Sequence, residues 1–224
     1  MEKGIIMKTV TVAQMKQIEH NAAQSGLSYT QMMENAGTEA AGFLTALQPS
    51  VHTITIFAGK GNNAGDGFVA ARLLKAAGCN VTIVLSDGVV QTPDARLNLE
   101  KAKACGILVL DFAEETACIA EHLKSGTFII DAIYGTGFHG ILRPNMRLIT
   151  KLINSSDCPV LSLDIPSGVN ADSGEADPDA IRAAWTIVFD SLKPAHTLDS
   201  SALFCGKIVP VDIGIPEKCH EISE

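Results

Sequence analysis

Short apolar segments rich in β-branched residues alternate with amphipathic segments along almost the whole chain, and this alternation limits the fold more than any other feature. We predict strands in HTITIFA, NVTIVLSD, ILVLD, TFIIDAIYG, CPVLSLDIPSG, AWTIVFD and GKIVPVDIG. We predict helices from about Thr11 to Gln24, from Ser28 through YTQMMENAGTEAAGFLTAL, and in FVAARLLKAAG, TPDARLNLEKAKACG, EETACIAEHLKSG and NMRLITKLINSS. No clear helix is predicted between the last two strands. Strands that alternate with helices indicate an α/β fold, a mostly parallel sheet covered on both faces.

Composition fits one globular domain and excludes several function classes. With 224 residues, 46% of them hydrophobic, the chain can bury a sizeable core. We predict one domain over 1–224, its core at about 10–216. The net charge of −8 disfavours nucleic acid and anionic membranes as partners. No apolar run approaches the ~18 residues of a membrane span. Six cysteines without a C-x-x-C pair indicate reduced, mostly core thiols and a cytoplasmic protein.

The glycine-rich turn GKGNNAGDG, residues 59–67, follows the first predicted strand. Its Gly59-x-Gly61-x-x-Ala64 pattern satisfies the dinucleotide-binding fingerprint. We expect the glycines at 59, 61, 65 and 67 to take positive φ angles and to let the backbone approach a ligand. A helix beginning near Asp66 would direct free N–H groups at a phosphate. A tight strand–helix connection without a ligand is the alternative.

Two later strands also end in polar, glycine-containing loops, DAIYGTGFHG (131–140) and DIPSGVNADSG (164–174). Ligands of parallel sheets bind beyond the carboxyl ends of the strands, so we expect all three loops to border one pocket. Asn63, Asp131 and Ser167 offer hard oxygen donors that suit a hard cation. Each strand-end aspartate, Asp131 and Asp164, has an alternative role as a cap of its own loop.

The loops together closely resemble the NAD(P)H-hydrate epimerase family, also called the YjeF N-terminal domain family. The resemblance rests on MMENAG, GKGNNAGDGFVAARLL, DAIYGTGFHG, LDIPSGVNADSGE and LKPAH, in this order, and covers roughly residues 10–216. Two positions depart from the family pattern: Ala64 and Ala195 stand where glycine is usual. The resemblance implies a Rossmann-like three-layer α/β/α sandwich, often as a homodimer. Many bacterial relatives continue into a dehydratase domain, whereas this chain looks like the epimerase alone.

The resemblance also implies a reaction. Members interconvert the R and S forms of NADH or NADPH hydrated at C6 of the nicotinamide ring (NAD(P)HX), so that a separate dehydratase acting on the S form can clear both. This is metabolite repair by an isomerase, with NAD(P)HX as substrate and one K⁺ per subunit. It implies K⁺ ligands at Asn63, Asp131 and Ser167. It implies substrate contacts at Asn62, Asn63, Ala64, Gly65, Asp66, Gly135, Thr136, Gly137, Phe138, His139, Gly140, Ile141 and Asp164.

The chemistry suggests which residues act on the substrate. If the C6 hydroxyl is protonated, it leaves as water, and the neighbouring ring nitrogen stabilises the cation as an iminium. Water then adds from either face, which requires a general acid, a general base and negative potential. We predict that Asp164 is this acid and base and that Lys193 orients it.

Two other functions remain open from the sequence. An NAD-dependent dehydrogenase is one, because Asp87 stands near the position of a ribose-binding acid. A non-catalytic nucleotide-binding module is the other. Conversion of R-hydrate to S-hydrate without added NAD separates all three.

Overall fold

The computed structural model describes residues 8–47, 52–124 and 127–221. The helices are α1 (Val12–Gln24), α2 (Tyr29–Leu47), α3 (Asn62–Ala76), α4 (Pro93–Ala104), α5 (Phe112–Lys124), α6 (Pro144–Asn154) and α7 (Asp199–Cys205). The strands are β1 (Thr53–Ala58), β2 (Asn80–Leu85), β3 (Leu108–Asp111), β4 (Phe128–Ala132), β5 (Val160–Leu163), β6 (Trp185–Phe189) and β7 (Lys207–Val211). Two 3-10 turns follow β6 and β7, at Pro194–His196 and Glu217–His220.

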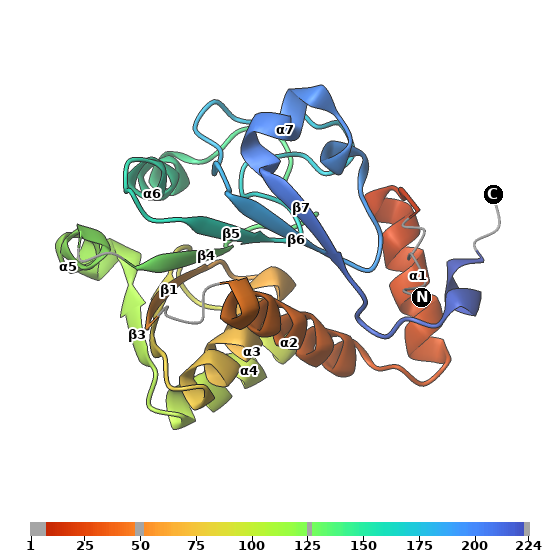
Figure 1. The fold of residues 1–224 in the computed structure, drawn as a ribbon, viewed down its shortest axis with the longest axis horizontal. Coiled ribbons are helices and arrows are strands. Elements are labelled where there is room, and N and C mark those ends of the chain that lie inside the picture. Colours follow the sequence, from red (N-terminus) through yellow and green to blue (C-terminus); the bar gives the residue numbers. More distant parts are fainter. Residues whose placement is uncertain (1–7, 48–51, 125–126, 222–224) are drawn as a thin grey trace.

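The strands form one sheet in the order β3-β2-β1-β4-β5-β6-β7, and every neighbouring pair is parallel. Helices α2, α3 and α4 cover one face, and α5, α6 and α7 cover the other (Figure 1). This confirms the predicted three-layer α/β fold. The strand order reverses between β1 and β4, and such a switch point is where open parallel sheets bind ligands.

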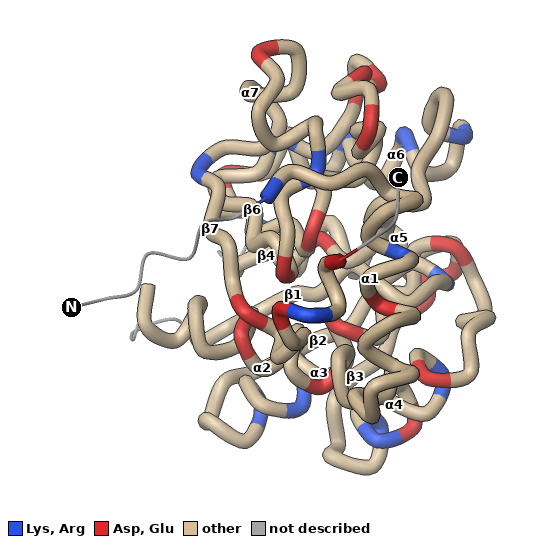
Figure 2. The backbone as a smooth tube through the Cα atoms, turned by 90° about the vertical axis from the view of Figure 1, so that its right-hand side faces the viewer, with Lys and Arg blue, Asp and Glu red and all other residues tan. Residues whose placement is uncertain are grey.

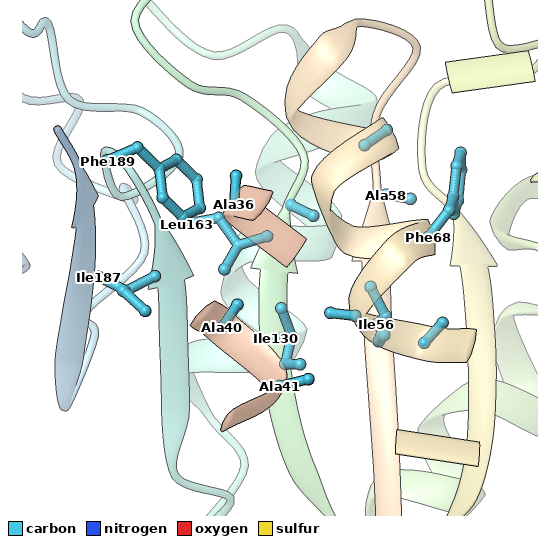
Figure 3. Packing of buried hydrophobic residues seen from close by; sticks show 14 of the residues in the cluster. Ala36, Ala40, Ala41, Ile56, Ala58, Phe68, Ile130, Leu163, Ile187 and Phe189 are labelled. Carbon is cyan, nitrogen blue, oxygen red and sulfur yellow. The ribbon is translucent and has the colours of Figure 1, made fainter. Parts of the chain in front are cut away.

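The core on the α2 and α3 side depends on small residues. Figure 3 shows Ile56, Ile130, Leu163 and Ile187, from four adjacent strands, together with the alanines of α2. Gly37 of α2 faces α3 so closely that an added Cβ atom would lie 2.4 Å from the Val69 Cβ atom. Small side chains therefore let α2 approach α3 and the sheet closely, which holds the start of α3 beside the strand ends.

Helix boundaries mostly follow the predicted signals. Thr11 caps α1 in a capping box with Gln14, and Ser28 accepts a hydrogen bond from the Gln31 N–H. Gly78 and Gly106 end α3 and α4 with φ angles of +92° and +70°. The last two residues of the predicted helix EETACIAEHLKSG, 125–126, lie outside the described residues.

Two predictions about the helices were wrong. The helix predicted near Asp66 begins four residues earlier, at Asn62. A short helix, α7, lies between the last two strands, where none was predicted. Both segments have weak local helix signals: the first contains two glycines and two asparagines, and the second is only seven residues long.

Two further predictions need correction. None of the glycines at 59, 61, 65 and 67 has a positive φ angle. Gly59 and Gly67 are needed for packing instead: an added Cβ atom would lie 2.0 Å from the Ile133 carbonyl oxygen at Gly59 and 2.7 Å from the Ala132 Cβ atom at Gly67, whereas it would meet open space at Gly61. The cysteines are not mostly core, because only Cys205 and Cys219 are buried, although all six are free thiols.

Among the described helices, none has the length and apolar character needed to cross a membrane.

Candidate functional site

A cavity of about 400 Å³ lies at the carboxyl ends of β1, β4 and β5. It is lined by the 60–63 turn, the 133–137 loop, Asp164, Lys193 and residues of α1 and α2. All three glycine-containing loops contribute residues to the wall of this cavity, as expected from the sequence. A larger cavity of about 730 Å³ opens at the amino ends of β1, β4 and β5, beside Thr127 and Cys158, and contains none of the predicted site residues.

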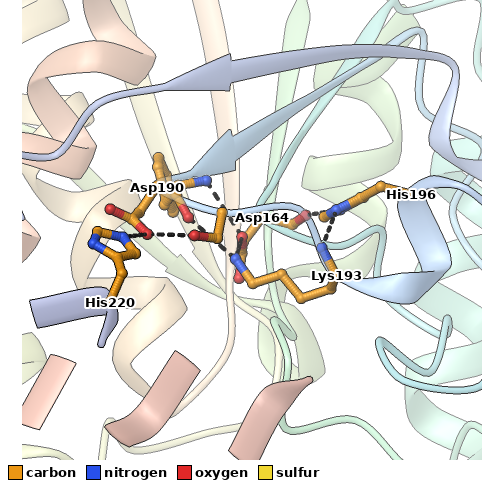
Figure 4. Close-up of polar contacts among 7 residues, drawn as sticks. Asp164, Asp190, Lys193, His196 and His220 are labelled. Atoms are coloured by element: carbon orange, nitrogen blue, oxygen red, sulfur yellow. Dashed lines mark hydrogen bonds and ion pairs between the residues drawn. The ribbon is translucent and has the colours of Figure 1, made fainter. Parts of the chain in front are cut away.

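A buried ion pair forms one wall of the cavity. The Lys193 ammonium lies 2.6 Å from the Asp164 carboxylate and also donates to the Phe189 carbonyl at 3.2 Å. Only 1% of the Lys193 side chain is exposed, against 13% for Asp164. Figure 4 shows Lys193 reaching Asp164 from the loop after β6. The predicted contact between these two residues is therefore present, and Asp164 also lines the cavity.

His196 ties the loop after β6, which carries Lys193, to Asp164 after β5. Its Nδ1 atom accepts a hydrogen bond from the Lys193 N–H at 2.9 Å, so its Nε2–H donates to the Asp164 carbonyl at 2.7 Å. Burial lowers the pKa of His196 to about 4, with the nearby Lys193 ammonium acting in the same direction. His196 is thus neutral near pH 7 and acts as a support behind the ion pair (Figure 4).

Two more carboxylates share the cavity with Asp164. Burial, followed by the negative charges of Asp164 and Glu19, raises the pKa of Asp66 well above its usual range. Burial first and Asp164 second raise the pKa of Glu19 to about 6. Figure 2 shows acidic segments around β1, β4 and α1. The cavity therefore brings together a buried carboxyl group with a raised pKa, on Asp66, and a carboxyl group paired with an ammonium, on Asp164.

Asp131 lies just below the cavity and is completely buried. It accepts hydrogen bonds from the Ser162 and Ser167 hydroxyls at 2.9 and 2.6 Å, and from the N–H groups of Ser167 and Ile133. Burial raises its pKa, and these hydrogen bonds only partly offset the effect. Four neutral donors thus surround a buried carboxylate, and no basic side chain in the described ranges is bonded to it.

Asn63 and Ser167 both contact the main chain of Tyr134, and Ser167 also contacts Asp131. The Asn63 amide donates to the Tyr134 carbonyl at 2.9 Å, and the Tyr134 N–H donates to the Ser167 hydroxyl at the same distance. Gly135 packs closely against Asn63, because an added Cβ atom would lie 3.3 Å from the Asn63 side-chain carbon. The three predicted cation ligands thus lie together, along with the main chain at Tyr134.

The other predicted substrate contacts divide into two groups. Asn62, Asn63, Asp66, Gly135, Thr136 and Gly137 line the cavity. Ala64, Gly65, Phe138, His139, Gly140 and Ile141 do not. Phe138 packs against the Tyr134 ring, and His139 bonds to the Asn170 amide at 2.9 Å. Ile141 is largely exposed, beyond the cavity.

Sequence reasoning missed the contribution of α1 and of the chain end. Lys16 and Glu19 of α1 line the cavity, yet no motif marks them. The His220 Nε2 atom forms a hydrogen bond of 2.8 Å with the Asp190 carboxylate, close to the Asp164 pair (Figure 4). Asp190 shares with Asp164 a positive φ angle, +63° and +62°, in the residues that follow β6 and β5. No local sequence signal pairs the two aspartates.

The chain matches the profile of a family described as "YjeF-related protein N-terminus" over residues 29–195. It is 36% identical to the NAD(P)H-hydrate epimerase of Pirellula staleyi, over 89% of this chain and 88% of that protein. It is 34% identical to the NAD(P)H-hydrate epimerase of Cenarchaeum symbiosum, over 95% and 98%.

Longer proteins and a solved structure are also similar. The bifunctional NAD(P)H-hydrate repair enzyme Nnr of Coxiella burnetii is 34% identical over 91% of this chain, which spans only 41% of that relative. The crystal structure of yeast ynu0, YNL200c, superposes with a TM-score of 0.77 at 26% identity, covering 85% of this chain and 84% of that one. Because the family profile covers most of the chain and the relatives align over nearly all of it, the chain belongs to the YjeF-related protein N-terminus family.

Proposed function

We propose that this protein is an NAD(P)H-hydrate epimerase, an isomerase of nicotinamide nucleotide repair that interconverts the R and S forms of NAD(P)HX at C6. One observation carries the proposal: the cavity at the sheet's switch point holds the Asp164–Lys193 pair together with Asp66, whose pKa is raised by burial. A transient cation flanked by an acid and a base needs this combination. Relatives named NAD(P)H-hydrate epimerase, aligned over most of the chain, support the same activity.

The two carboxyl groups divide the proton transfers. Asp66 gives its proton to the C6 hydroxyl, which leaves as water while the ring nitrogen lone pair forms the iminium. Water then adds at C6 from the other face and gives a proton to Asp164. Asp66 ends as the anion and Asp164 as the acid, and proton exchange through cavity water restores the first state. In the reverse direction the two groups exchange roles, so one arrangement serves both epimers.

Lys193 and Glu19 set the charge around this step. The Lys193 ammonium offsets the charge of the Asp164 carboxylate and holds this carboxylate in place. The ammonium is itself held by the Phe189 carbonyl. Glu19 adds negative potential where the iminium forms, since its pKa of about 6 leaves it mostly ionised at pH 7. The substrate's pyrophosphate lies at the start of α3, where N–H groups of the first turn are free of intrahelical partners.

The residues at Asn63, Asp131 and Ser167 fit a monovalent cation. All three offer oxygen donors, and the buried Asp131 has only neutral hydrogen-bond donors around it. When bound, K⁺ supplies a fixed positive charge that offsets Asp131. Asn63 and Ser167 join the loops after β1 and β5 to the loop after β4, and these contacts keep the cavity wall in shape.

The wider setting follows from the same proposal. The protein acts in the cytoplasm as a homodimer, and a separate dehydratase consumes the S form that it supplies. In the bifunctional relatives, which are more than twice as long, the region similar to this chain is part of one longer protein.

The proposal is tested with purified R-NADHX or R-NADPHX and no added NAD⁺. The chain should convert either compound to the equilibrium mixture of R and S forms. Chromatography that separates the two forms measures this conversion over time. Reduction or oxidation of a carbonyl substrate would instead support a dehydrogenase, and binding without turnover would support a non-catalytic module.

A further inference from the structure

Three charged side chains meet at the rim of the cavity, on the side away from Asp164. Lys60 lies 3.2 Å from the Asp87 carboxylate, and Arg143 forms an ion pair with the same carboxylate oxygen. Arg143 also donates to the Tyr134 hydroxyl at 3.0 Å. Lys60 and Tyr134 both line the cavity. Loops after β1, β2 and β4 thus join in one cluster, Lys60–Asp87–Arg143, which the proposed reaction does not use.

The charge of this cluster is opposite to that of the cavity floor. Two cations share one carboxylate, which leaves a net charge of +1. The side chains of Arg143 and Lys60 are 56% and 34% exposed, whereas only 13% of Asp87 is exposed. The cations therefore face solvent, and the carboxylate stays behind them. In a chain of net charge −8, such a rim attracts a phosphate, and the guanidinium of Arg143 matches phosphate geometry.

The sheet order places the cluster at one end of an extended dinucleotide. Asp164 follows β5 and Asp87 lies just beyond β2, with β4 and β1 between those strands. Three strand spacings separate β5 from β2, about 14 Å. The start of α3, after β1, lies between the two ends. A dinucleotide with its nicotinamide at Asp164 and its pyrophosphate at α3 therefore extends its adenosine ribose toward β2, as in dinucleotide-binding folds.

We propose that Lys60 and Arg143 bind the 2′-phosphate on the adenosine ribose of NADPHX and so set the preference for NADPHX over NADHX. In dinucleotide-binding folds an acid at this position bonds to the 2′-hydroxyl of NAD, and a nearby arginine accommodates the 2′-phosphate of NADP. Here the acid is already neutralised by the two cations, so it anchors them and does not repel a phosphate. This inference rests on the proposed epimerase function and concerns the far end of the same substrate.

The test compares kcat/KM for NADHX and NADPHX in the wild type, Arg143→Gln and Lys60→Gln. Each variant removes one charged donor from the phosphate, and such a contact contributes about 10- to 100-fold in affinity. We expect the NADPHX/NADHX ratio of kcat/KM to fall by this factor, mainly through a higher KM for NADPHX. Because Arg143 is exposed and Lys60 is partly exposed, both variants should fold.

Lys103→Gln is the matched control. Lys103 is an exposed lysine with an acidic partner, Glu100, in the last turn of α4, which precedes β3 and so lies toward the amino ends of the strands, away from the cavity. The NADPHX/NADHX ratio of kcat/KM in Lys103→Gln should equal that of the wild type. An unchanged ratio in both Arg143→Gln and Lys60→Gln overturns the inference, whether the two activities fall together or not at all. A wild type that epimerises neither compound refutes the proposed function instead, so the two failures are distinguishable.

Discussion

Asp164 holds a backbone conformation that few side chains adopt, with a φ angle of +62° directly after β5. Aspartate enters this region at lower cost than most residues, and here it directs the carboxylate to Lys193 while the carbonyl accepts from His196. Strain of this kind persists only where surrounding contacts over-determine it. The residue predicted to act as acid and base is thus held rigidly by its neighbours.

Lys193→Met tests how far the ion pair supports the fold. Removing the ammonium leaves Asp164 without its cation, and breaking a buried pair costs about 3–5 kcal/mol. Asp164 is partly exposed to the cavity, so we expect about 2–3 kcal/mol less stability in chemical denaturation. The double variant Lys193→Met with Asp164→Asn should regain part of this loss, since no unpaired charge remains. Equal free energies of unfolding for the single variant and the wild type would show that the ion pair does not stabilise the fold.

At this scale the sequence predicted strand-end residues far better than residues that dock from elsewhere. Asp131 and Asp164 end apolar segments, and parallel strands bring their ends to one edge by necessity. Glu19 has no such signal. It reaches the cavity because the start of α1 is tied to distant loops, through the Val12 N–H bonded to Asp172 at 2.8 Å and the Val10 N–H bonded to the Leu192 carbonyl.

Among the elements, α1 carries a testable pH dependence. The pKa of Glu19 is about 6 in the folded protein and 4.5 without its surroundings. A raised carboxyl pKa means that the folded state binds the proton more tightly, so the contribution of Glu19 to stability is full below pH 4.5 and lost as pH rises through about 6. The difference corresponds to about 2 kcal/mol.

Glu19→Gln should therefore stabilise the protein at pH 8 by about 1–2 kcal/mol and have little effect near pH 4.5. Denaturant unfolding at both pH values measures this. His20→Gln, an exposed neighbour on the same helix, is the control. An equal change at both pH values would mean that charge burial at Glu19 is not the cause.

The loops after β1, β4 and β5 should respond together to a monovalent cation. If Asn63, Asp131 and Ser167 hold K⁺, saturating K⁺ at 100 Kd should add about 2.7 kcal/mol to wild-type stability, a rise in Tm of several degrees over choline chloride. Asn63→Ala removes one oxygen ligand and leaves Asp131 bonded, so its K⁺-dependent rise should be much smaller. The same rise in Asn63→Ala and wild type would contradict the assignment.

Element prediction failed where tertiary packing overrides local preference. The segment 62–67 has poor helix propensity, yet it is helical because Gly65 packs under Met33 and Gly67 against β1 and β4. The apolar strands were predicted well because burial on both faces makes them nearly continuous apolar runs.

For the whole molecule, the alternation of strands and helices was enough to predict the parallel, three-layer architecture. It was not enough to give the strand order, which decides that the loops after β1 and β4 are neighbours at the switch point. The same order separates the charges: carboxylates gather at the carboxyl ends of β4 and β5, and the Lys60–Asp87–Arg143 cluster lies by β2. The proposed function thus depends on a strand order that could not be predicted from the pattern of apolar and polar residues.

The most direct test of the account is R-to-S conversion of NADHX in H₂¹⁸O by the wild type and Asp164→Asn. We predict that ¹⁸O enters C6 at each wild-type turnover, because water leaves and returns. Asp164→Asn should bind NADHX with similar affinity and convert it about 10²–10⁴ times more slowly, the usual contribution of a positioned acid or base. Conversion without ¹⁸O uptake, or a wild-type rate in Asp164→Asn, would contradict the account.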